Sequence, residues 1–168
     1  MTVNVTEDAW APLPGSLPAE PRAGVVYVIP TRRPVDDDGE PRYTDQVRFL
    51  PKAARLAGAP VEFSMPEGSR RFLQEFSANP DQWALGIAVL AIANDWLIFT
   101  VSQFIELMRH GRGWTAEQAQ ARPLKVSVVE VNENAGTART ITVEGPAADV
   151  LEALRDFQTG NSGAQDQK

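Results

Sequence analysis

The alternation of hydrophobic and polar positions is clearest in the second half of the chain. Residues 97–108 carry Leu, Ile, Val, Phe and Met at helical spacing, until Gly111 and Gly113 end the pattern. Residues 124–131 and 137–143 are rich in β-branched side chains and flank a polar loop, so they predict a β-hairpin. The segment after Gly145-Pro146 predicts a last helix. Its expected buried stripe is Val150, Leu151, Leu154 and Phe157.

Helix-start signals in the middle of the chain predict a helical core. Ser64-Met65-Pro66-Glu67 has the form of a capping box with a proline in the first turn, and Asn79-Pro80 repeats the signal. The run from 83 to 93 is the most apolar part of the chain and is interpreted as a helix. Asn94-Asp95 interrupts the run and favours a boundary between two buried helices.

These elements together predict an α+β fold. A helical core at about residues 66–121 would pack on a small sheet that contains the C-terminal hairpin at 124–143. Strands at 25–29 and 61–64 could extend this sheet. The final helix would cover one face, because a two-stranded hairpin is barely stable alone.

Prolines divide the chain into its expected parts. Eight of the 13 prolines lie in the first 51 residues, and each fixes φ and removes a backbone donor. Residues 1–23 are therefore predicted to be a flexible arm, 24–158 a single α+β domain, and 159–168 a disordered tail. The acidic run at 36–40 lacks the alternating ligand spacing of a calcium loop, which favours a solvated loop.

Composition excludes several classes of function. Lys and Arg number 16 against 22 Asp and Glu, and a net charge of -6 lacks the basic footprint of a nucleic-acid binder. The absence of cysteine excludes thiol catalysis and thiolate metal sites, and the single histidine excludes a multi-histidine metal centre. No phosphate-binding or hydrolase motif is present. We therefore expect no metal, no cofactor and no nucleic-acid partner, and the sequence argues against an enzyme.

Seven residues are candidates for contact with a partner or ligand. They are Trp10, Arg70, Arg71, Asp95, Trp96, Arg109 and His110. Trp10 lies in the proline-rich arm, where it is either an exposed docking anchor or packs back on its own domain. Arg109, His110 and Arg112 either hold an anion or form an exposed helix end. Arg70 and Arg71 either line a polar cleft or belong to a solvated face.

Asp95 and Trp96 sit within the apolar stretch. A carboxylate there could act as an acid or base with a raised pKa, or it caps the helix that begins beside it. Capping uses that carboxylate fully, and it is the preferred interpretation.

Residues 83–101 could also form a segment that spans a membrane. They include one formal charge, Asp95, and approach the length of about 20 residues that a bilayer crossing needs. A charge at the centre of a span is costly, so a buried helical hairpin is preferred to a membrane segment. Residues 1–8 are acidic and have no apolar signal region, which favours a cytoplasmic location.

The order from residue 80 to 158 runs long apolar helices, a linker, a β-hairpin and a helix after Gly145-Pro146 with the run Ala148-Asp-Val-Leu-Glu-Ala-Leu154. This order resembles the small effector-associated adaptor domains of bacterial conflict systems. The resemblance covers less than half of the chain, implies an adaptor role without enzyme activity, and transfers no functional residue.

The preferred function is a non-catalytic interaction or regulatory module that binds a protein partner in a larger assembly. The first alternative is a small-ligand-binding protein or an enzyme that uses carboxylates and arginines. A cleft that joins Asp95 with Arg70 or Arg71 would support it. The second alternative is a protein attached to a membrane through residues 83–101.

Overall fold

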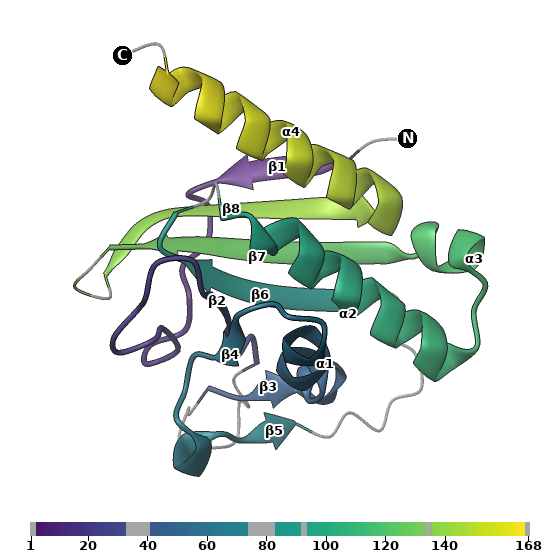
Figure 1. Ribbon diagram of the computed structural model, residues 1–168, viewed down its shortest axis with the longest axis horizontal. Coiled ribbons are helices and arrows are strands. Elements are labelled where there is room, and N and C mark those ends of the chain that lie inside the picture. The colour runs from purple at the N-terminus through teal and green to yellow at the C-terminus, as the bar shows by residue number, and fades with distance from the viewer. Residues whose placement is uncertain are drawn as a thin grey trace.

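The centre of the molecule is a mixed β-sheet (Figure 1). A computed structural model describes residues 3–32, 41–73, 83–91, 94–132, 134 and 136–166. The sheet strands are β1 (Asn4–Glu7), β2 (Val26–Val28), β4 (Val61–Phe63), β6 (Trp83–Val89), β7 (Pro123–Val131) and β8 (Thr137–Pro146). Their order across the sheet is β1-β8-β7-β6-β2-β4. Two short strands, β3 (Tyr43–Thr44) and β5 (Phe72–Leu73), form a separate parallel pair.

One face of this sheet is covered by helices α1 (Leu50–Leu56), α2 (Trp96–Arg112) and α4 (Ala147–Asp166) (Figure 1). The helix α3 (Ala116–Gln120) lies between α2 and β7 in the chain, and the short 3-10 helices are η1 (Asp45–Val47) and η2 (Glu67–Ser69). Alternate residues of β7 belong to the core beneath the helices, among them Leu124, Val126 and Val128. This alternation follows from the period of two along a strand.

The predicted helical core at 66–121, packed on a small sheet, is wrong. Residues 83–89 form strand β6, which runs parallel to β7 at the centre of a six-stranded sheet. A central parallel strand is buried on both faces, so its sequence is continuously apolar and imitates a buried helix. The segment after Ser64 forms η2 and β5 in place of a helix. The helix start predicted at Asn79-Pro80 lies outside the described residues.

The apolar stretch at 83–101 therefore changes structure along its length. It begins as β6, and α2 starts at Trp96, directly after the Asn94-Asp95 dipeptide. None of the helices described combines the length and apolar character that crossing a bilayer requires.

The other face of the sheet, here called the far face, is covered by the proline-rich N-terminal segment. Strand β1 pairs antiparallel with β8, and the chain then turns onto this face. Trp10 and Leu17 pack against an apolar cluster that includes Tyr27 and Val129. The turn is held at Thr140, whose backbone carbonyl accepts from Asp8 N–H at 2.8 Å and whose hydroxyl donates to the Trp10 carbonyl at 3.1 Å. The N-terminal segment is thus packed on the domain along residues 8–17.

Candidate functional site

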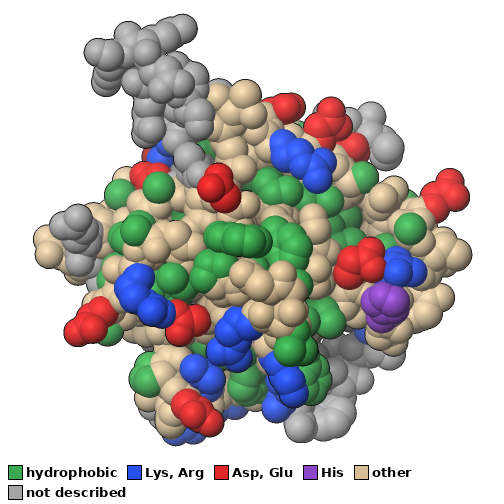
Figure 2. All heavy atoms as spheres, in the orientation of Figure 1, with side chains coloured by type: hydrophobic (Ala, Val, Ile, Leu, Met, Phe, Trp, Pro, Cys, Tyr) green, Lys and Arg blue, Asp and Glu red, His purple; other side chains and the backbone are tan. Residues whose placement is uncertain are grey.

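The segment from residue 41 to 73 carries a charge opposite to that of the whole chain. We call it the basic lobe; it contains η1, α1, β3, β4, η2 and β5. It holds six Lys and Arg residues against three Asp and Glu residues, in a chain whose net charge is -6. Figure 2 shows blue basic side chains among green hydrophobic ones over the part of the surface where α1, β3 and β5 lie in Figure 1.

Three aromatic rings form the frame of the basic lobe. The ring centroids of Tyr43 and Phe63 are 5.0 Å apart, and those of Tyr43 and Phe72 are 5.5 Å apart. Tyr43 is fully buried, and its hydroxyl hydrogen-bonds to Ser64 Oγ at 3.1 Å and accepts from Met65 N–H at 3.0 Å. Burial raises the pKa of this hydroxyl, although the Ser64 hydrogen bond lowers it. The neutral phenol therefore ties β3 to the turn after β4.

Two arginines lie over rings of this aromatic frame. The Arg48 guanidinium carbon is 4.4 Å from the centroid of the Phe72 ring, and that of Arg70 is 4.6 Å from the Phe63 centroid. Arg48 Nε also donates to Asp45 Oδ1 at 2.8 Å, and Arg70 Nε donates to the Met65 carbonyl at 2.9 Å. Cation–π contacts and these hydrogen bonds hold the two cationic groups in defined positions at the surface.

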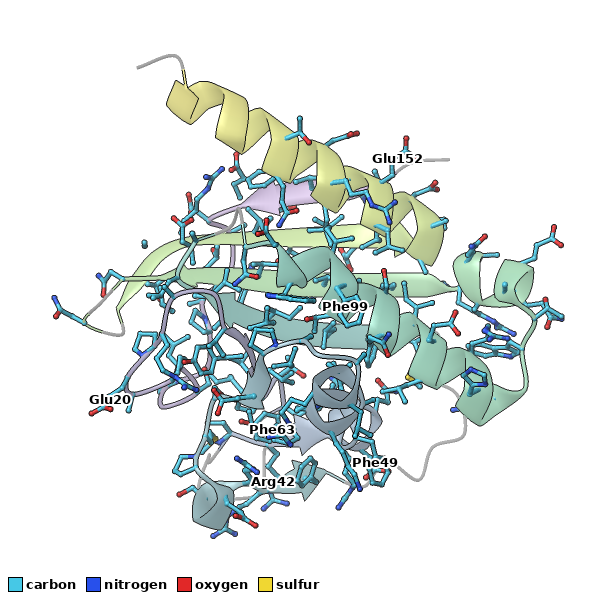
Figure 3. All side chains as sticks on the ribbon, viewed as in Figure 1. Glu20, Arg42, Phe49, Phe63, Phe99 and Glu152 are labelled. Carbon is cyan, nitrogen blue, oxygen red and sulfur yellow. The ribbon has the colours of Figure 1, made fainter. Side chains whose placement is uncertain are left out.

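Exposed hydrophobic side chains accompany these cations. Phe49 is 64% exposed and Leu56 is 82% exposed. Phe49 is the N-cap residue of α1 and Leu56 is its last residue; Lys52 lies between them. Residues 49, 52 and 56 are spaced by three and four, which places them along one side of the helix. Figure 3 shows Phe49, Phe63 and Arg42 together in the lower part of the molecule.

The sequence-predicted candidates do not gather in one place. Arg70 and Arg71 belong to the basic lobe, where the Arg71 carbonyl accepts the Tyr43 N–H at 2.9 Å. Asp95 lines a different cavity of about 280 Å³, beside Gly24, Leu90 and Trp96. Neither arginine is among the lining residues of that cavity. The cleft that would have joined Asp95 with these arginines is therefore not formed by the described residues.

Asp95 is exposed, and its side chain makes no capping hydrogen bond to α2, so the capping interpretation is wrong. Asn94 takes this role: its Oδ1 accepts from the Trp96 N–H at 2.7 Å. The Asn94 carbonyl also accepts from Gln158 Nε2 of α4 at 3.0 Å. The indole of Trp96 contacts Phe99 edge to face, with centroids 5.7 Å apart.

Asn94→Ala should therefore destabilise the protein more than Asp95→Ala. Loss of a side-chain cap costs about 0.5–2 kcal/mol, whereas an exposed substitution usually changes stability by less than about 0.5 kcal/mol. Urea denaturation of the two variants measures the difference in the free energy of unfolding. Equal midpoints would contradict the assignment of Asn94 as the cap.

Arg109 and His110 face a carboxylate of their own helix. Glu106 Oε2 accepts from Arg109 Nη2 at 3.0 Å and lies 3.6 Å from His110 Nε2. Arg112 instead lies over the Trp83 ring, 5.2 Å from its centroid. The three side chains therefore do not converge on one anion-binding point. Among the residues described, no three His, Cys, Asp or Glu side chains are grouped so that they could hold a metal ion.

Sequence reasoning overlooked Phe49, Leu56 and Arg48. For Arg48 the signal is the excess of basic residues at positions 41–73, which the net charge of the whole chain hides. The exposure of Phe49 and Leu56 follows only from the packing of α1. Comparisons of the chain with known protein families, with curated proteins and with solved structures found no match.

Proposed function

We propose that the protein is a non-catalytic protein-interaction module, and that its basic lobe binds an acidic segment of a partner protein. The observation that carries this proposal is the exposure of Phe49 and Leu56 beside the cations of the lobe. Such a surface matches a partner segment that alternates acidic and apolar side chains.

The apolar part of the proposal rests on α1. Its buried residues are Leu50, Pro51 and Ala54, so this short helix already contributes to the core through its inner side. Phe49 and Leu56 lie outside that contact and stay exposed. Burying a side chain of this size against a partner gains about 1.5–3 kcal/mol. Single exposed apolar residues are ordinary on protein surfaces, but two on one side of a helix provide adjacent anchors.

The electrostatic part rests on the two arginines that lie over aromatic rings. Arg48 and Arg70 are already held on aromatic rings, so less side-chain entropy is lost when a carboxylate binds them. Arginine and aromatic residues are enriched at protein interfaces, whereas a chain with a net charge of -6 repels a long polyanion. These features favour an acidic protein segment over a nucleic acid.

The experiment compares partner capture by three forms of the chain. In vivo crosslinking with the wild type, with the double variant Phe49→Ser/Leu56→Ser, and with Val5→Ser is followed by quantitative mass spectrometry. Val5 is 47% exposed on β1, outside the basic lobe, and is the matched control. We expect the partner to be lost at least tenfold with the double variant and retained with Val5→Ser, since only the first removes the anchors.

The captured partner is then purified and its binding measured between low and high salt. Binding that weakens with salt, and that maps to an acidic segment, supports the proposal. Equal capture by the wild type and the double variant would refute it. Recovery that depends on RNA, or binding to anionic vesicles in place of protein, would also refute it.

The adaptor role implied by the resemblance at 80–158 and the expected cytoplasmic location stay predictions, and both agree with this proposal. The first of the apolar helices predicted for that region is a strand in the structure, β6.

A further inference from the structure

A second cavity lies on the far face of the sheet, away from the basic lobe. It has a volume of about 270 Å³ and lies between the N-terminal segment and strands β6 and β7. The strands leave this space because Ala84 and Ser127 present small side chains there. Further along the same strands, Ala88 and Val129 are covered by the packed N-terminal segment. The N-terminal segment thus packs directly on one part of the far face and forms a wall of the cavity over the neighbouring part.

The polar groups of this cavity are cations and hydroxyls. Arg32 and Lys125 line it together with Thr31 and Ser127, and of the described lining residues none is Asp or Glu. Lys125 is half-buried. The carboxylate nearest to it in the strand register is Glu144, its pairing partner on β8, which does not line the cavity. The charged side chains among the described lining residues are therefore all cationic.

The remaining wall is apolar. Trp10, Pro12 and Ile29 contribute to it, so a ligand would meet charge on one side and hydrocarbon on the other. Low-dielectric walls strengthen the attraction between a cation and a bound anion. The volume is slightly below the range of about 300–1,000 Å³ that is typical of ligand pockets, which limits the ligand to a small molecule.

We infer that the far-face cavity binds a small organic anion that has a carboxylate or phosphate group and a short apolar part. Lys125 would neutralise the anionic group, the hydroxyls of Thr31 and Ser127 would donate hydrogen bonds to it, and Trp10 and Ile29 would pack on the apolar part. This inference is independent of the partner proposed for the basic lobe, because the two surfaces share no residue.

The test uses three probes of nearly equal shape and different charge: benzoate, benzamide and benzamidine. Titration of the ¹⁵N-labelled protein follows the amide signals of Ala84, Lys125 and Ser127. Benzoate should produce saturable shifts at these positions, benzamide should bind at least tenfold more weakly, and benzamidine should produce no saturation. Acetate and inorganic phosphate test whether a smaller anion is preferred.

Two variants and one control locate the binding. Lys125→Met keeps most of the side-chain length and removes the charge, so it should weaken benzoate binding at least tenfold. Ser127→Val adds volume at a strand position and should block the cavity. Lys52→Met makes the same chemical change on the exposed side of α1 and should leave binding unchanged. Melting curves of all three confirm that each variant is folded.

Three outcomes would overturn the inference. The first is a lack of saturable shifts with benzoate, acetate and phosphate alike. The second is binding that is unchanged in both Lys125→Met and Ser127→Val. The third is benzamidine binding as tightly as benzoate, since that would mean the cavity does not select for negative charge.

Discussion

Replacing Leu154 with aspartate should leave the protein largely unfolded. Leu154 is 1% exposed and lies in α4, within the core cluster that joins this helix to the sheet. The substitution would place a carboxylate among apolar side chains, where an unpaired charge is strongly unfavourable. Even truncation of a buried leucine costs about 2–5 kcal/mol, against a total stability of about 5–15 kcal/mol for a typical domain. Thermal unfolding followed by circular dichroism measures the effect.

Glu152→Lys is the matched control on the same helix. Glu152 is exposed on the outer side of α4 (Figure 3), so reversing its charge should change stability by no more than about 0.5 kcal/mol. If Leu154→Asp melted like the wild type, the packing of α4 against the sheet would be incorrect. The stripe formed by Val150 and Leu154 would then be an interface with another molecule.

Gly86→Val should also destabilise the fold strongly, for a different physical reason. A Cβ atom at Gly86 would lie 2.6 Å from Thr31 Cγ2 and 2.8 Å from Ile29 Cγ1. The strands are already tied together here, because the Ile29 N–H donates to the Gly86 carbonyl at 3.0 Å. Valine would force the chain at 29–31 away from β6. Overpacking of this kind costs about 1–3 kcal/mol. Urea denaturation reports the loss as a lower midpoint.

Gly68→Ala provides the comparison. A Cβ atom at Gly68 would have no neighbour within 4 Å, and this glycine does not have a positive φ. Alanine at this position should therefore have a midpoint close to that of the wild type. Similar midpoints for Gly86→Val and Gly68→Ala would show that the close approach between β6 and residues 29–31 does not exist.

The helices and strands whose signals lie within a few neighbouring residues were predictable from the sequence. The hairpin strands β7 and β8 and the starts of α2 and α4 lie close to the positions that the pattern indicates. The end of α4 does not, because this helix continues to Asp166, into the segment that was predicted to be a disordered tail. The signals of the predicted elements are contained within a few residues: β-branched runs around a polar turn, a helical stripe, and a polar dipeptide before a helix. The α+β class followed from these elements, but their arrangement did not.

The candidate surfaces could not be read from the sequence in the same way. Arg48 and Arg70 are distant in the chain, and their common surface exists because β3 pairs with β5. The far-face cavity brings Arg32, in the segment that follows β2, to the same space as Lys125 of β7. For Trp10 the sequence allows an exposed docking anchor or a side chain packed on its own domain. The packing of the N-terminal segment on the far face places it against its own domain.

By itself, the sequence determined which classes of function its composition excludes, and it determined the local elements of the C-terminal half. The absence of cysteine, the single histidine and the net charge of -6 are properties of the chain in any conformation. Only the tertiary structure decided that residues 83–89 form a strand. Their apolar run fits a buried helix or a buried strand equally well, and the pairing of β6 with β7 on one side and β2 on the other selects the strand. That selection comes from hydrogen bonds between segments distant in sequence, which no local pattern of side chains encodes.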